Sequence, residues 1–269
     1  MVNCDRIHVH YEKRLPPSGT DFNRCLIFLH GGGGNGKLWH HQTDHFSRQH
    51  EVITVDLPGS GSSSKNIDHN MAIMTTAVTL HDLIDRRVVS KHVTLVGHSY
   101  AGSVMDEMLD DLPVSVDSIV FVDSTFIADD EEAKKRRAFA SNLLTLPVET
   151  MARRIREWYG AMTGRKLPEK EWKLIMDALD QTDPTWLLQV MAATKLTQKR
   201  YERPVVDRQW MVTVGIIESD FFAGDNPQSW RNYFQQCYYC HLEGTAHFLF
   251  MEQPEEFNQC LERFVKQLV

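Results

Sequence analysis

The chain has 269 residues, of which 42% are hydrophobic, and its formal net charge at pH 7 is −7. This length allows one large domain with an insertion and a sizeable buried core. The negative charge and the absence of a long basic stretch argue against nucleic acid or an anionic membrane surface as the main partner, so we expect a small-molecule substrate.

The start of the chain carries neither the basic residues nor the continuous apolar stretch of a secretory signal, and no run is long enough to span a membrane. We therefore expect a cytoplasmic protein; the sequence carries no signal for its oligomeric state. The five cysteines are scattered and odd in number, which argues against a disulfide framework. Cys237 and Cys240 form a CxxC, but positions three apart in a strand point to opposite faces, which disfavours a redox or zinc role.

Short apolar runs of strand type alternate along the chain with longer stretches of helical period. The expected strands are 25–29, 51–55, 92–96, 118–122, 210–217 and 237–242. The expected helices between and after them are 37–49, 71–87, 100–111, 227–236 and 254–268. This alternation predicts an α/β protein with a mostly parallel sheet flanked by helices.

The expected strand 25–29 leads through a histidine into four glycines, residues 31–34. Glycine N–H groups in such a loop can hold the negative oxygen of a tetrahedral intermediate, and we assign one of these donors to Gly32. A phosphate-binding loop is the alternative, because the stretch 31–38 has the glycine and lysine spacing of that motif. Leu38, however, stands where the motif places a magnesium-binding hydroxyl.

His41 and His45 are one helical turn apart in the expected helix 37–49, and Asp44 is adjacent to them. A zinc site is conceivable here, but no third ligand is evident. We therefore favour an exposed helix surface and expect no metal.

The expected strand 92–96 runs into Gly-His-Ser-Tyr-Ala-Gly and then into a helix. In this context a serine sits on a sharp, strained turn, so Ser99 is the candidate nucleophile and the N–H of Tyr100 the second oxyanion donor. Gly97 and Ala101 are small enough for the close approach of strand and helix, although Ala101 departs from the strict G-x-S-x-G pattern by one methyl group. An ordinary strand-to-helix turn is the alternative.

No strand signal occurs between residues 125 and 204, where the sequence has the period of several amphipathic helices. We predict a helical cap at 125–204, inserted into a core formed by 1–124 and 205–269. Within it, acids precede bases in the run 129–137, which favours a solvated helix over a targeting signal. Most apolar residues of the cap are expected to pack on the core. Candidates for lining a substrate pocket are Gly31, Trp158, Tyr159, Trp172, Trp186 and Met191.

The loop after the last expected strand carries His247, whose neutral imidazole can take the proton from a serine hydroxyl. A carboxylate must orient this ring and stabilise its charged form. We favour Asp220, which follows the penultimate strand and gives the chain order Ser, Asp, His. Asp123, at the end of the strand before the insertion, is the alternative acid, and Glu218 is a weaker third candidate.

Four motifs in this order resemble those of the α/β-hydrolase superfamily: HGGGGNGKLW at 30–39, DLPGSGSS at 56–63, GHSYAG at 97–102 and GTAHFLFMEQPEEF at 244–257. The resemblance implies an eight-stranded, mostly parallel sheet with a helical cap inserted after the sixth strand, above Ser99. Haloalkane dehalogenases, zearalenone lactonases and cofactor-independent quinolone dioxygenases of this superfamily place the acid where Asp123 stands. Dehalogenases and epoxide hydrolases attack with an aspartate, so Ser99 disfavours both chemistries.

The expected function is that of a carboxylesterase-like or lactonase-like serine hydrolase, which cleaves an ester, lactone or related acyl substrate with an apolar or aromatic portion and needs no cofactor. A first alternative is carbon–carbon bond cleavage or cofactor-free dioxygenation on the same fold, with His247 deprotonating the substrate. A second alternative is a non-catalytic small-molecule receptor, because a fold alone does not determine function.

Overall fold

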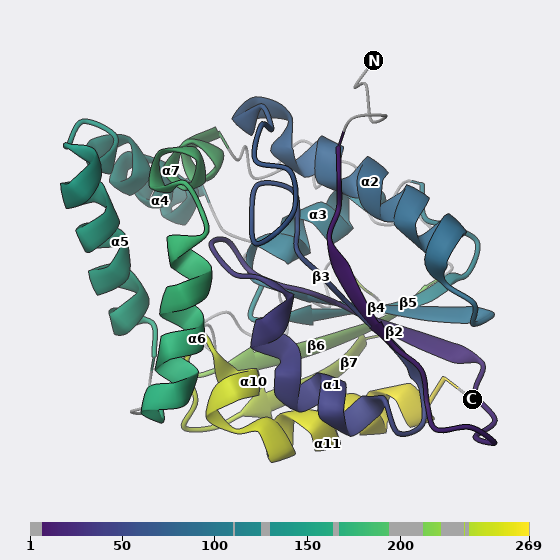
Figure 1. Cartoon of the computed structure of the whole chain (residues 1–269). Coiled ribbons are helices and arrows are strands. Elements are labelled where there is room, and N and C mark those ends of the chain that lie inside the picture. The colour runs from purple at the N-terminus through teal and green to yellow at the C-terminus, as the bar shows by residue number, and fades with distance from the viewer. Residues whose placement is uncertain are drawn as a thin grey trace.

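One mostly parallel sheet with helices on both faces forms the centre of the molecule (Figure 1). The computed structural model describes residues 7–109, 111–124, 130–163, 167–193, 212–221, 234 and 237–268. Within these ranges seven strands occur in the spatial order β1-β3-β2-β4-β5-β6-β7, and only the β1–β3 pair is antiparallel. The expected architecture is therefore confirmed, although the eighth strand that the resemblance implies has no counterpart among the described residues.

The strands follow the apolar runs of the sequence closely. They are β1 Tyr11–Arg14, β2 Arg24–Leu29, β3 Glu51–Val55, β4 His92–His98, β5 Val116–Val122, β6 Thr213–Ser219 and β7 Cys237–Leu242. All residues of β2 and β3 are buried, as expected for central strands of a parallel sheet that is covered on both faces. β1 was not predicted, because its sequence YEKR is polar and forms an edge strand with alternating burial.

Helices cover the two faces of the sheet, and all of them except α10 lie close to predicted positions. They are η2 Gly36–Trp39, α1 His40–Phe46, η3 His69–Met71, α2 Ala72–Arg87, α3 Tyr100–Met108, α10 Leu249–Glu252 and α11 Pro254–Lys266. Helices α2 and α3 cover one face, and α1 and α11 cover the other (Figure 1). The expected helix 227–236 lies outside the described residues, apart from Phe234.

Four helices occupy the described part of the chain between β5 and β6 and lie together beyond one end of the strands (Figure 1). They are α4 Asp130–Leu143, α5 Val148–Ala161, α6 Glu169–Asp180 and α7 Pro184–Ala193, and we call them the helical insertion. Their apolar side chains, among them Ile155 and Ile175, are buried in the same core as α1 and α11. The boundary expected at residues 204 and 205 lies outside the described residues.

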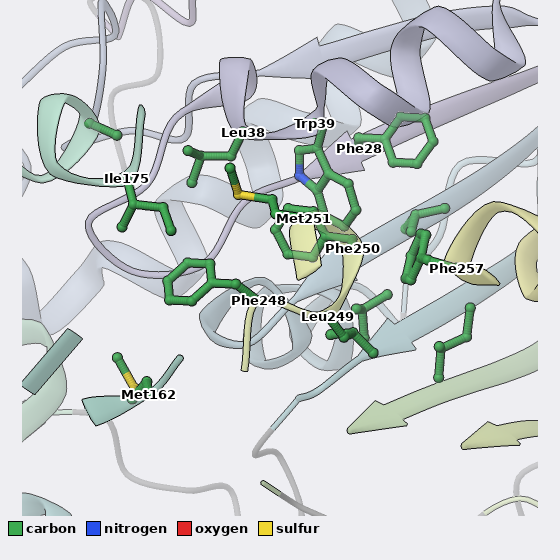
Figure 2. Close-up of a cluster of buried hydrophobic side chains, with 14 of the residues drawn as sticks. Phe28, Leu38, Trp39, Met162, Ile175, Phe248, Leu249, Phe250, Met251 and Phe257 are labelled. Atoms are coloured by element: carbon green, nitrogen blue, oxygen red, sulfur yellow. The ribbon is translucent and has the colours of Figure 1, made fainter. Parts of the chain in front are cut away.

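A cluster of aromatic side chains joins the end of the glycine-rich loop to the segment after β7. Trp39 of η2 stacks on Phe250 of α10 with ring centroids 4.0 Å apart, and Phe28 of β2 lies 5.1 Å from the same indole (Figure 2). All three rings are fully buried. Burial of such large rings stabilises the packing of these two segments, which are distant in sequence.

A disulfide bond joins Cys240 of β7 to Cys260 of α11, with the Cα atoms 6.3 Å apart. The sequence pattern did not predict this pair, because 20 residues separate the two cysteines and neither spacing nor composition indicates their contact. Cys237 packs on the opposite face of the sheet, with α2 and α3, so the CxxC cysteines do not act together. None of the described helices combines the length and apolar content that crossing a bilayer needs.

Candidate active site

Ser99 lies on the sharp turn between β4 and α3, with backbone angles φ 51° and ψ −112°. Among the described residues other than glycine, only Ser99 and Asp123, which has φ 42°, adopt a positive φ. Such a conformation costs about 1–3 kcal/mol and persists where the surrounding structure enforces it, most often at functional sites. Both strained residues follow the carboxyl ends of neighbouring parallel strands, β4 and β5.

The small residues that flank Ser99 are required by the packing of the turn. A Cβ atom on Gly97 would lie 2.8 Å from the sulfur of Met105, and one on Gly102 would lie 2.5 Å from the hydroxyl oxygen of Ser124. At Ala101, by contrast, the methyl group is fully buried and accommodated. The departure from the strict glycine pattern at this position is therefore compatible with the sharp turn.

The glycine-rich loop lies directly against the serine. A Cβ atom on Gly31 would be 3.1 Å from Cβ of Ser99, and one on Gly32 would be 3.9 Å from Cβ of Tyr100. The backbone segments expected to supply the two oxyanion donors, at Gly32 and Tyr100, are therefore neighbours. The hydroxyl of Tyr159, in α5 of the helical insertion, donates a hydrogen bond to the carbonyl oxygen of Gly32 and ties this loop to the insertion.

The same loop is unsuited to phosphate. The backbone N–H of Gly36 donates to a carboxylate oxygen of Asp56 at 2.8 Å, and the other oxygen of Asp56 accepts from the N–H of Ser62. A phosphate at this position would meet the negative charge of Asp56. The geometry therefore disfavours the phosphate-binding alternative.

His247 lies in the loop between β7 and α10 and is buried. Its Nδ1 is 3.1 Å from Oδ2 of Asp123, its backbone N–H donates to the carbonyl of Met162, and its carbonyl oxygen lies 2.7 Å from Nε2 of His98. Burial and, to a smaller extent, the nearby charge of Arg136 together lower the pKa of His247 to about 3. The imidazole is therefore neutral near pH 7, and an Nδ1–H directed at Asp123 leaves Nε2 as the basic nitrogen.

Asp123, the first residue after β5, has a fully buried side chain. It accepts hydrogen bonds from the backbone N–H of Ser219 at 2.8 Å and from the Ser219 hydroxyl at 2.7 Å, in addition to its contact with His247. Burial raises the pKa of Asp123 to about 7, whereas the two Ser219 donors favour the ionised form. Ser219 was not singled out from the sequence, although it stands between the two other acid candidates.

Asp220, the acid favoured from the sequence, lies away from the imidazole of His247. Its side chain is half exposed, with one oxygen 2.8 Å from Nε2 of His241 and the other accepting the N–H of Gly244 at 2.7 Å. Because successive side chains point to opposite sides at the end of a strand, a Ser219 that faces Asp123 directs Asp220 elsewhere. Glu218, the third candidate, is buried and accepts a hydrogen bond from Tyr239.

A cavity of about 350 Å³ lies between the carboxyl ends of the strands and the helical insertion, and both Ser99 and His247 line it. Five of the six residues expected at a pocket are among its walls; Trp172 is not, and packs against the apolar core instead. The five are Gly31, Trp158, Tyr159, Trp186 and Met191.

Three cationic side chains of the described residues also line this cavity, and the sequence pattern did not place them there. They are Lys135, Arg136 and Arg137, all from α4. The run 129–137 predicted a solvated helix, and helix α4 is present, but three of the four basic residues at 134–137 line the cavity. Local spacing predicts the helix and says nothing about which of its faces meets the core.

The histidine cluster in α1 is arranged differently from the expected exposed surface. His45 lies 2.7 Å from Glu262 of α11, and Asp44 pairs with Arg14 of β1 at 2.6 Å. His41 instead faces Glu171 of the helical insertion. The two histidines therefore have separate carboxylate partners.

We expect the free energy of unfolding to fall as the pH is lowered from about 6.5 to about 4. Burial lowers the pKa of His30 to about 4 and that of His247 to about 3, and it lowers the pKa of His98 as well. Below about pH 6.5 the histidines of the unfolded chain bind protons, whereas the buried rings of the folded protein stay neutral, and this difference favours unfolding. For His30 alone the effect is on the order of 3 kcal/mol.

Asp123 acts in the opposite direction, because a raised pKa contributes stability at low pH that is lost as the pH rises through about 7. Three histidines oppose this one carboxyl, so the net loss on acidification remains. Urea unfolding at several pH values between 6.5 and 5, where most carboxylates stay ionised, measures it. A urea midpoint that does not change over this interval would contradict the assignment of neutral buried rings. His81→Gln removes a histidine on the surface of α2 and should show the same pH dependence as the unaltered protein.

Comparisons with known proteins agree with this fold. The sequence profile described as "Alpha/beta hydrolase family" matches residues 26–259. Protein ABHD8 of Bos taurus is 32% identical over 120 residues, which are 43% of this chain and 27% of that protein, so the match spans about a quarter of the relative's length. The (E)-2-((N-methylformamido)methylene)succinate hydrolase of Acinetobacter baylyi is 22% identical over 90% of both chains. The solved structure of MenH from S. aureus superposes with a TM-score of 0.78 at 18% identity, covering 96% of this chain and 98% of that one.

Proposed function

The chain belongs to the alpha/beta hydrolase family, and from this premise and the geometry of the pocket we propose that it is a serine hydrolase acting through an acyl-enzyme. Its substrates are esters, lactones or related acyl compounds with an apolar portion. The helical insertion acts as a cap over a core formed by residues 1–124 and 205–269. No cofactor is needed for this chemistry, and the expected cytoplasmic location stays a prediction.

In the proposed mechanism, Nε2 of His247 takes the proton of the Ser99 hydroxyl as its oxygen attacks the substrate carbonyl. The backbone N–H groups of Gly32 and Tyr100 stabilise the resulting oxyanion, each by about 3–4 kcal/mol. Asp123 holds the imidazole in the tautomer with Nδ1–H and stabilises the imidazolium that forms. The imidazolium then protonates the leaving group, and water activated by His247 releases the acyl group from Ser99.

The observation that carries this proposal is the contact between Nδ1 of His247 and buried Asp123, in a site where Ser99 lines the same cavity as His247. A serine hydroxyl becomes a competent nucleophile only beside a base, and the base in turn needs a partner that fixes its tautomer. The proposed acid thus differs from the one favoured by the sequence. Asp123 takes the role because Asp220 is engaged by His241 and Gly244.

We further propose that the substrate carries a carboxylate beside its apolar body. Most of the cavity wall is apolar, with contributions from Trp158 and Trp186, but Lys135, Arg136 and Arg137 bring positive charge to the same space. Guanidinium groups recognise carboxylates well. The name of the Acinetobacter relative, a succinate hydrolase, is consistent with an acidic substrate.

A panel of nitrophenyl esters tests this function. We expect hydrolysis with stoichiometric labelling of Ser99 by a fluorophosphonate, located by peptide mass spectrometry, because the proposed site activates that hydroxyl alone. Esters whose acyl chain ends in a carboxylate should show the higher kcat/KM when compared with neutral esters of equal length. Oxygen uptake with an aromatic hydroxy substrate would support dioxygenation instead, and ligand binding without turnover of any ester would support a receptor.

A further inference from the structure

Two adjacent histidines at the start of α1 face one carboxylate of the helical insertion. Nε2 of His40 and Nε2 of His41 each lie 3.4 Å from Oε1 of Glu171, which belongs to the first turn of α6. The two imidazole rings are close together, with centroids 3.9 Å apart. One ligand atom from each of the three residues lies within 4.8 Å of the other two. The cluster is separate from the cavity that holds Ser99, whose lining includes none of the three.

Within the described part of the chain, three polar atoms of this cluster are buried and have no hydrogen-bond partner. Glu171 is only 6% exposed, and its Oε2 is buried without a hydrogen bond. Both ring nitrogens of His40 are likewise buried and unpartnered. The distances of 3.4 Å from the histidines to Oε1 are longer than a good N–H···O hydrogen bond. Buried polar groups in folded proteins nearly always have a partner, so this arrangement indicates a ligand between them.

Two of the three separations between the ligand atoms match the coordination of zinc. Zinc binds histidine nitrogen and carboxylate oxygen at about 2.0–2.2 Å in tetrahedral geometry, which separates two ligand atoms by about 3.3–3.6 Å along an edge of the tetrahedron. Both histidine–Glu171 separations have this value. Two imidazoles and one carboxylate form a ligand set that zinc accepts, with water as the fourth ligand. We propose that His40, His41 and Glu171 bind a Zn²⁺ ion.

This site differs from the one that the sequence suggested. The spacing of His41 and His45 within one helix suggested a zinc site that had no evident third ligand. In the structure His45 pairs with Glu262 instead. The missing ligand comes from Glu171, which lies in a different helix, 130 residues after His41. The sequence around Glu171 does not indicate that it contacts α1.

A bound ion at this position joins the helical insertion to the core. His40 directly follows η2, at the end of the glycine-rich loop, and Ile175, one turn beyond Glu171 in α6, lines the cavity above Ser99. Zinc therefore holds one wall of the cavity against the segment that follows the oxyanion loop. The ion plays a structural part and takes no part in the proposed hydrolysis.

Calorimetric titration of the metal-free full-length protein with Zn²⁺ tests the site. We expect one equivalent to bind and to raise the melting temperature, and Co²⁺ to bind with the visible absorption of a tetrahedral complex. His41→Ala and Glu171→Gln should each weaken binding by more than about a hundredfold, which is the upper range for loss of a mere supporting partner. His45→Gln, one turn from His41 in the same helix, should bind zinc as the unaltered protein does.

Three outcomes would overturn the proposal: no binding of either metal, equal binding by all variants, or loss of binding in His45→Gln. His40→Ala provides a second ligand variant if Glu171→Gln does not fold, and circular dichroism of each variant shows whether it is folded. Metal binding is the readout throughout, so the result is independent of whether the protein hydrolyses esters.

Discussion

Replacement of Ser99 by alanine is expected to lower kcat for an activated ester by about 10⁴- to 10⁶-fold. The loss is this large because the hydroxyl is the proposed nucleophile, while the oxyanion donors at Gly32 and Tyr100 alone supply only the remaining catalysis. The alanine side chain fits the same turn, whose φ of 51° is enforced by its surroundings. Fluorophosphonate labelling should disappear while the melting temperature changes by only a few degrees.

Ser103→Ala is the matched control, because Ser103 lies one turn further along α3 and lines the same cavity. Its kcat should stay within a few-fold of that of the unaltered protein. Substantial ester hydrolysis by Ser99→Ala would remove this serine from the chemistry. Such a result would favour the alternative in which His247 acts directly on the substrate.

The strands and the loops that follow them were the most predictable part of the fold. The strands 51–55 and 237–242 were predicted to the residue, because a covered parallel sheet requires continuous apolar runs bounded by polar turns. Glycine runs and the isolated Ser99 turn are also local signals, since they follow from the close approach of backbones. β1 was missed because its stability comes from pairing with β3 and not from its own composition.

The partner of His247 was not predictable with the same certainty. Asp123 and Asp220 both follow parallel strands, so both reach the same edge of the sheet, and chain order alone favoured Asp220. What separates them is the direction of each side chain at the strand end, which depends on the φ of 42° at Asp123 and on the two donors from Ser219. Neither feature has a sequence signal of its own.

Contacts between the helical insertion and the core could not be predicted from local sequence patterns for a similar reason. The period of apolar residues predicts amphipathic helices in 125–204 but leaves their packing open. The contact of Tyr159 with the carbonyl of Gly32 and the approach of Glu171 to His41 both join segments more than a hundred residues apart. Long-range contacts of this kind come from the tertiary arrangement alone.

Asp123→Asn is expected to lower kcat by about 10³- to 10⁴-fold, whereas Asp220→Asn should change it by less than about tenfold. The asparagine amide is close in size to the carboxylate, so the buried position can accept it. An amide N–H directed at Nδ1 of His247 would, however, place the ring proton on Nε2, and the ring could then no longer accept the proton of Ser99. Steady-state kinetics of both variants with the same ester measures the difference.

The two variants also differ in what they report about the geometry, because Asp220 lies at the half-exposed end of β6 and pairs with His241, outside the Ser99 cavity. A larger loss in Asp220→Asn than in Asp123→Asn would show that the imidazole uses Asp220 during turnover and would contradict the assignment.

The Ser219→Ala variant tests how the carboxyl of Asp123 is positioned without removing its charge. It removes the hydroxyl donor 2.7 Å from Asp123 but keeps the backbone N–H, so the carboxyl remains and only its support is weakened. Its kcat should therefore fall between those of the unaltered protein and Asp123→Asn. The acidic limb of its pH profile should also move, because the Asp123–His247 pair titrates as a unit and the loss of one donor to the carboxylate alters the proton affinity of that pair.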